Sequence, residues 1–127
     1  MKNIKYLLMA VVSFIVINVW FFRFNKPTVY RGGGALNMIE EFSVYGLSEP
    51  FVYIIGGLKV MAAIGLLIGL YYKKAILPSS LLMATLMLGA ISMHFKINDA
   101  IIKFFPATLM FILSLSIILM DRKKELS

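Results

Sequence analysis

One lysine in the middle of a long apolar run is the residue of this chain best placed to do chemistry. The run is residues 51–72, FVYIIGGLKVMAAIGLLIGLYY, and Lys59 lies near its centre. About 20 mostly apolar residues, each rising about 1.5 Å, cross a hydrocarbon core of about 30 Å, so the run predicts a membrane-spanning helix. An ammonium group at that depth costs about 3 kcal/mol on insertion scales and persists only where it faces protein or water. Lys59 is therefore expected to point into a helix bundle and to meet a partner there.

The second candidate is His94, the only histidine of the chain, which lies near the end of a later apolar run. An imidazole at that position can contact a quinone or another substrate, or it can bond a neighbouring span. Two interpretations of Lys59 are also open. It either binds a ligand or takes part in proton transfer, or it forms an ion pair with Glu40, Glu41 or Asp99 that fixes the helix register.

Several other chemistries are excluded or lack a motif. The chain has no cysteine, which rules out disulfides, thiolate zinc sites and iron–sulfur ligation within it. A single histidine cannot supply two haem ligands, and the sequence shows no phosphate-binding loop and no pairing of a nucleophile with a base. We therefore predict no catalytic residue, no metal site and no independent catalytic activity.

Composition places the chain in the membrane class. Of its 127 residues 61% are hydrophobic and only 15% are charged, far from the usage of a soluble domain. The net charge of +7 comes from basic residues scattered at the ends of apolar runs. Such scattering indicates contact with the lipid bilayer rather than with nucleic acid.

The pattern of apolar runs predicts an all-α fold, a single domain over residues 1–127 that forms an antiparallel four-helix membrane bundle. Short second and third connections imply that consecutive spans are antiparallel neighbours. In the long first connection, apolar residues recur at helical spacing opposite Glu40 and Glu41, which predicts a short amphipathic helix in the first outer loop. The predicted spans are residues 4–22, 51–72, 75–95 and 100–120.

Small residues mark one face of the second span. Ala62, Gly65 and Gly69 recur at spacings of three and four, and such a stripe lets a neighbouring helix approach closely. We predict that these three residues pack against another span.

The polar residues of the predicted spans gather in one half of the bundle, which predicts a pocket that opens toward the amphipathic segment. Asn18, the one strongly polar residue inside the first span, is expected to meet another helix there. The candidate ligand-binding residues are Lys59, His94, Asn18, Glu40 and Glu41.

Basic residues also predict the orientation. The density of Lys and Arg is higher in the segments that share a side with the two termini, which favours the cytoplasm for both ends of the chain. We expect a multi-pass protein of a bacterial-type inner membrane.

Short motifs resemble those of the DoxX-like branch of the DoxX membrane-protein family. They are Tyr45-Gly46-Leu47, residues 51–57 leading to Leu58-Lys59, and Gly89-Ala90 followed by His94. The chain has Ser48 where the family turn often has proline, and Lys59 lies in a span where the wider family often has an acidic residue.

The resemblance implies a small four-span bundle. Some relatives are associated with quinone-linked oxidation or respiratory oxidases, others with oxidative-stress complexes or membrane-protein assembly. The leading interpretation is a non-catalytic membrane subunit, or a component of a redox-linked complex that binds a quinone or another apolar ligand. The alternative is an assembly or interaction factor that contacts other membrane subunits, or further copies of itself, through its glycine stripe and outer loop.

Overall fold

The computed structural model describes residues 2–28 and 30–126, and within these residues the chain is helical and contains no strand. The prediction of an all-α fold is therefore confirmed. Short π-helical or 3-10 turns occupy Asn18–Phe22, Gly32–Gly34, Lys73–Ala75 and Ile101–Phe104. The α-helices are α1 (Lys2–Ile17), α2 (Met38–Val44), α3 (Glu49–Ile68), α4 (Ile76–Lys96) and α5 (Phe105–Leu126).

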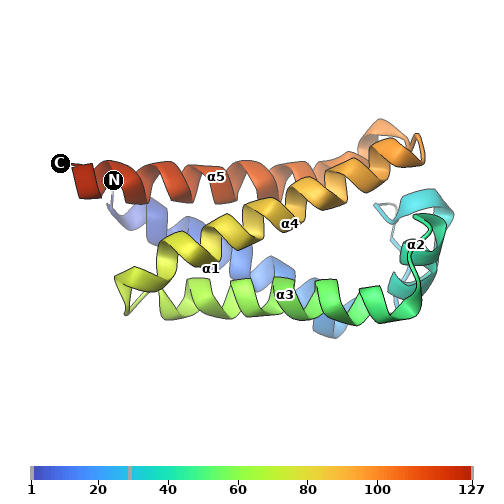
Figure 1. Cartoon of the computed structure of the whole chain (residues 1–127), viewed down its shortest axis with the longest axis horizontal. Coiled ribbons are helices and arrows are strands. Elements are labelled where there is room, and N and C mark those ends of the chain that lie inside the picture. The colour runs from blue at the N-terminus through green and yellow to red at the C-terminus, as the bar shows by residue number, and fades with distance from the viewer. Residues whose placement is uncertain (1, 29, 127) are drawn as a thin grey trace.

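The four long helices form a closed ring. Helix α1 packs against α3 and α5, and α4 packs against the same two helices (Figure 1). Both termini lie at one end of the bundle, and the short helix α2 covers the opposite end (Figure 1). The predicted antiparallel four-helix bundle with a short helix in its first connection is the observed arrangement.

Four helical segments are long and apolar enough to cross a membrane, and their bounds shift slightly from the predicted ones. They are Asn3–Phe22, Glu49–Ile68, Lys73–Lys96 and Ile101–Arg122. Helix α3 ends before the predicted residue 72 because Gly69 caps it and the chain turns directly afterwards. The regular helix α5 begins only at Phe105, where Pro106 occupies the first turn and its missing N–H costs nothing.

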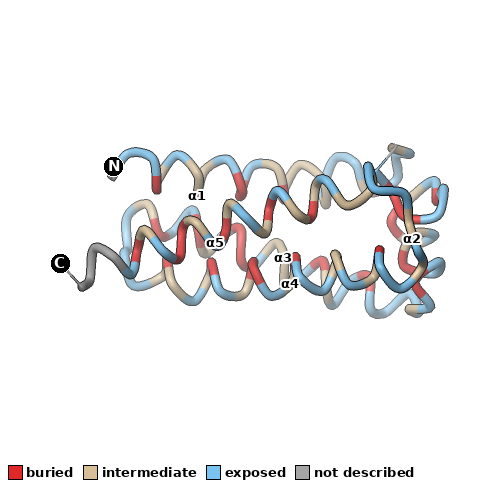
Figure 2. Tube along the Cα trace, turned by 90° about the horizontal axis from the view of Figure 1, so that it is seen from above, coloured by how far each residue is buried: buried red, intermediate tan, exposed pale blue. Residues whose placement is uncertain are grey.

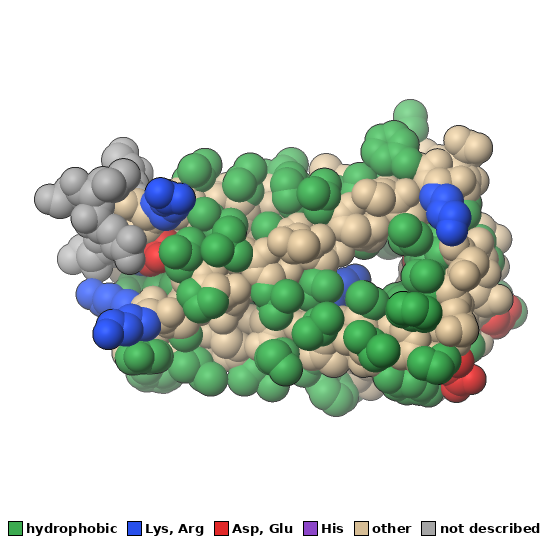
Figure 3. All heavy atoms as spheres, viewed as in Figure 1, with side chains coloured by type: hydrophobic (Ala, Val, Ile, Leu, Met, Phe, Trp, Pro, Cys, Tyr) green, Lys and Arg blue, Asp and Glu red, His purple; other side chains and the backbone are tan. Residues whose placement is uncertain are grey.

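The fully buried part of the apolar core lies in the half of the bundle nearest the termini. Its fully buried members come from all four long helices, and Figure 2 shows buried positions along the inner sides of the helices. Large apolar side chains also cover the outer faces of the helices seen in Figure 3, as expected for a surface in lipid. The largest fully buried side chains of this core are Met9, Val12, Leu66, Ile76, Met83 and Ile117.

The small-residue face of α3 lies against α4 and α1. Ala62 is buried, and a Cβ atom added at Gly65 would collide with the Ser79 side chain. One added at Gly69 would lie 2.8 Å from Ile76 and 2.9 Å from Met9. The neighbouring residues of α4 and α1 therefore pack closely against this face, with no room for a larger side chain at Gly65 or Gly69.

A buried ion pair joins the first and last helices near the termini. The Lys5 ammonium lies 3.3 Å from the Asp121 carboxylate, and both side chains are at least nine-tenths buried. Sequence analysis treated Lys5 only as a boundary charge and did not predict this pairing, which links residues 116 positions apart.

Candidate functional site

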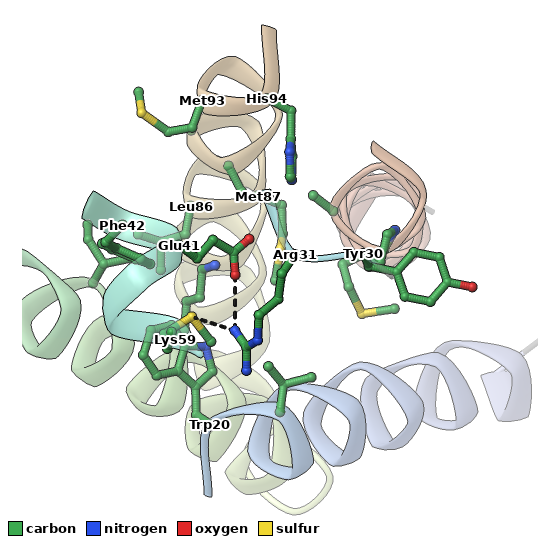
Figure 4. Close-up of a pocket in the computed structure, with 18 of the residues that line it drawn as sticks. Trp20, Tyr30, Arg31, Glu41, Phe42, Lys59, Leu86, Met87, Met93 and His94 are labelled. Atoms are coloured by element: carbon green, nitrogen blue, oxygen red, sulfur yellow. Dashed lines mark hydrogen bonds and ion pairs between the residues drawn. The ribbon is translucent and has the colours of Figure 1, made fainter. Parts of the chain in front are cut away.

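A cavity of about 660 Å³ lies inside the bundle, between the apolar core and helix α2. Its wall is mostly apolar and is built by residues from each of the five α-helices, as Figure 4 shows for part of it. The volume falls in the range of about 300–1,000 Å³ that small-molecule sites usually have. Lys59, His94 and Glu41 all line this one cavity.

The Lys59 side chain projects into the cavity beside Trp20. Its Nζ atom lies 5.7 Å from the centre of the Trp20 ring, a favourable cation–π distance. Gly56 makes room for this indole, because a Cβ atom added there would collide with the ring. Within the described residues the Lys59 ammonium forms neither a hydrogen bond nor an ion pair. Lys59 is therefore a basic group in a mostly apolar wall, with no carboxylate of the described residues within ion-pair distance.

Glu41, the carboxylate above Lys59 in Figure 4, is held by three other groups. One oxygen accepts a hydrogen bond from the Arg31 guanidinium at 3.0 Å. The other accepts from the Gly32 backbone N–H at 3.0 Å and from the Tyr45 hydroxyl at 2.7 Å. Burial, together with the nearby Glu41 charge, raises the pKa of the Tyr45 phenol above its usual range. Glu41 therefore stabilises the α2 segment through these three bonds.

Arg31 is buried and ties the irregular segment before α2 into the site. Its guanidinium donates to the backbone carbonyls of Lys26, at 2.8 Å, Phe24, at 3.1 Å, and Arg23. Its own carbonyl accepts a hydrogen bond from the Lys103 ammonium at 2.6 Å. Because three carbonyls and Glu41 surround it, the guanidinium acts as the anchor of the connection between α1 and α2.

His94 is oriented by the turn that ends α4. Asn98 takes a left-handed conformation with φ of 53°, and the Asp99 N–H then bonds back to the His94 carbonyl at 3.0 Å. This arrangement is a Schellman turn, and it folds the Asp99 carboxylate over the ring, 2.6 Å from Nδ1. The second Asp99 oxygen accepts from the Gly33 N–H at 3.1 Å. Since Nδ1 is bonded to Asp99, Nε2 is the ring nitrogen of His94 that remains available to bind a molecule in the cavity.

Two of the predicted site residues are not part of the cavity wall. Glu40 is exposed, and it forms a reciprocal cap with Asn37 at the start of α2, with two bonds of 2.8 Å. Asn18 begins the π-helical turn after α1, where its carbonyl accepts from the Arg23 N–H at 3.2 Å. The structure thus brings together Lys59, His94 and Glu41 but not these two.

Sequence analysis missed the residues that shape the site around Lys59. It singled out none of Trp20, Arg31 and Gly56. Neither spacing nor composition links them to Lys59, because their contacts join segments far apart in the chain. The one signal in the sequence is that carboxylates are few in this apolar chain, so several basic residues could compete to bind Glu41.

The cavity has an opening on the side of the bundle. Figure 3 shows the surface hollowed between α3 and α4 next to α2, with atoms of a basic side chain inside. Gly89 of α4 lines the cavity, and a Cβ atom added there would meet no atom within 4 Å. The opening lies between α3 and α4, two helices long and apolar enough to cross a membrane.

These features define a membrane protein of the four-helix bundle class with a mostly apolar internal cavity and a lysine, Lys59, that projects into it from a candidate membrane span. The model of the DoxX-like family matches residues 28–116, which include α2, α3, α4 and most of α5. The chain therefore belongs to the DoxX-like family, as its motifs predicted. No curated protein and no solved structure matches it.

Proposed function

We propose that this DoxX-like protein binds a lipid-soluble molecule in its internal cavity, with the polar head of that molecule against Lys59. It does so as a non-catalytic membrane component of a redox-linked complex, and quinones belong to the class of molecule that fits. One observation carries the proposal: the Lys59 ammonium faces an apolar cavity while the described carboxylates near it bond other groups.

The energetics support a ligand in contact with Lys59. A charge at this depth is costly unless it is compensated, and Arg31 and His94 already engage the carboxylates that sequence analysis considered as partners, apart from the exposed Glu40. An acceptor group on a ligand would complete the coordination of the ammonium. Such a bond is stronger in the low dielectric of the cavity than in water.

The proposal is tested by asking what the protein retains when it is extracted together with native lipid. Small molecules bound to the wild type, Lys59→Met and Gly89→Leu are released and compared by mass spectrometry. Lys59→Met removes the ammonium, and Gly89→Leu places a side chain into the open space beside the cavity. The matched controls are Lys74→Met, in the exposed turn between α3 and α4, and Gly57→Leu, at an open position of α3 outside the cavity wall.

We expect one lipid-soluble molecule to be enriched with the wild type and both controls. Its amount should fall about tenfold or more in Lys59→Met, as the loss of a hydrogen bond to a charged group implies, and it should also fall in Gly89→Leu, where the added side chain competes for space. Melting curves should show all five proteins folded. Equal small-molecule content in the wild type and both cavity variants would overturn the proposal.

A further inference from the structure

The charges around the cavity are unbalanced. Four of the residues that line it are basic, namely Arg23, Arg31, Lys59 and Lys103, whereas Glu41 is the one carboxylate among the lining residues. Asp99 adds a second negative charge next to His94. Even when both carboxylates are counted against them, the four cations leave an excess of positive charge in the described site.

Of the four cations, Arg23 is exposed, and among the other three Lys59 has the fewest polar partners within the described residues. Arg31 is compensated by Glu41 and by backbone carbonyls, and Lys103 donates to the Arg31 carbonyl. The Lys59 ammonium, by contrast, forms no hydrogen bond or ion pair within the described residues, and it lies 5.7 Å from the centre of the Trp20 ring. A cation–π contact offsets part of the cost of a desolvated ammonium, but it supplies no negative charge.

The lining and the opening of the cavity indicate the chemical character of the part of the ligand that does not contact Lys59. Apolar side chains of α1, α4 and α5 make up most of the wall around Lys59, for example Val16, Met87 and Met110. The opening lies between two candidate membrane spans, α3 and α4, on a side of the bundle with many apolar side chains (Figure 3). A molecule with a polar head and one long apolar chain can therefore place its head at Lys59 while its chain extends toward the lipid.

From these observations we propose that the ligand is an anionic single-chain amphiphile of the fatty-acid class, whose carboxylate is the missing counter-ion of Lys59. This inference rests on the proposed ligand-binding function and narrows it to a charged head. A neutral head could accept one hydrogen bond from Lys59, but it would leave the positive charge of the cavity uncompensated.

The single tryptophan provides the measurement, because Trp20 lies beside Lys59 and the chain contains no other indole. The protein is placed in nanodiscs of zwitterionic lipid and titrated with palmitic acid brominated next to its carboxyl group, or with the methyl ester of the same acid. Bromine quenches indole fluorescence at short range, and the absence of cysteine keeps the probe from alkylating a thiol of the chain. The two probes differ only in the charge of the head.

We expect saturable quenching by the acid at a concentration about tenfold or more below that of the ester, as for a charge-assisted bond. Lys59→Met should abolish this preference, whereas Lys59→Arg and Lys74→Met should keep it. Equal quenching by acid and ester in the wild type, lost in Gly89→Leu, would overturn the anionic ligand but leave the proposed ligand site. If neither probe quenches saturably and no small molecule co-purifies, both proposals are wrong. The wild-type comparison decides the charge of the head even if Lys59→Met fails to fold.

Discussion

At the scale of single residues, the hydroxyl group of Tyr45 makes the stability of the protein depend on pH. This hydroxyl donates to Glu41, and burial and that carboxylate raise the pKa of the phenol above its ordinary value of 10.0. The unfolded chain releases this proton near pH 10, but the folded protein retains it. The contribution of Tyr45 to stability is therefore complete below pH 10 and is lost as the pH rises toward the raised pKa.

We predict that Tyr45→Phe lowers the free energy of unfolding by about 1.5–3 kcal/mol at pH 7, through loss of one hydrogen bond to a charged carboxylate. Above pH 10 the wild type should lose up to about 1.4 kcal/mol per pH unit from this group, and the variant should not. Melting curves in detergent between pH 7 and 11.5 measure both effects. Tyr53→Phe, at an exposed position of α3, is the control, and parallel pH profiles for wild type and Tyr45→Phe would contradict the assignment.

Lys59 and His94 could be selected from the sequence because a charged or titratable group in an apolar run is rare and costly. Their surroundings could not be predicted in the same way. Glu41 was an open partner for Lys59, but Arg31, ten residues earlier in the chain, bonds to it instead. Arg31 reaches Glu41 because the chain turns at Gly33 and Gly34, where φ is 60° and 79°. In the sequence, these glycines indicate only that the segment is irregular.

At the scale of helices, the close contacts of α3 depend on residues without side chains. Gly65 lies where a larger residue would collide with Ser79 of α4, whereas Gly57, two turns earlier, faces open space. The two glycines belong to the same helix, so any general effect of helix propensity applies to both. A comparison of the two positions therefore isolates the contact between α3 and α4.

We predict that Gly65→Leu lowers the free energy of unfolding by about 1–3 kcal/mol, the usual cost of overpacking. Gly57→Leu should leave it unchanged or raise it slightly, because leucine favours the helix more than glycine does. Thermal unfolding of both variants in detergent and in bilayers gives the comparison. If Gly65→Leu melts at the wild-type temperature in both media, this face of α3 does not control packing.

The presence of each helix could be predicted from the sequence more accurately than the residues at which it begins and ends. Four apolar runs of membrane length predicted four long helices, and the amphipathic spacing opposite Glu40 and Glu41 predicted α2. The ends depend on local caps instead. Asn37 caps α2 through its side chain and Gly69 ends α3, and hydropathy carries no information about such bonds.

At the scale of the whole molecule, the polar and apolar halves of the bundle have different roles. The half near the termini is closed by the apolar core and by the Lys5–Asp121 pair. The half under α2 holds the cavity, Lys59 and the His94–Asp99 pair. The orientation of the bundle therefore decides which leaflet of the membrane the cavity opens to.

Our last prediction places both termini in the cytoplasm and α2 on the outer side, because Lys and Arg are denser at the end of the bundle that holds the termini. The chain has no cysteine, so Ser43→Cys in α2 and Lys74→Cys in the turn between α3 and α4 each introduce one thiol at an exposed position. In intact spheroplasts an impermeant maleimide should label Ser43→Cys, whereas Lys74→Cys should react only after the membrane is permeabilised. The two positions lie at opposite ends of the bundle (Figure 1), so the opposite pattern would move the cavity to the cytoplasmic half. The opening between α3 and α4 would then draw its ligand from the inner leaflet.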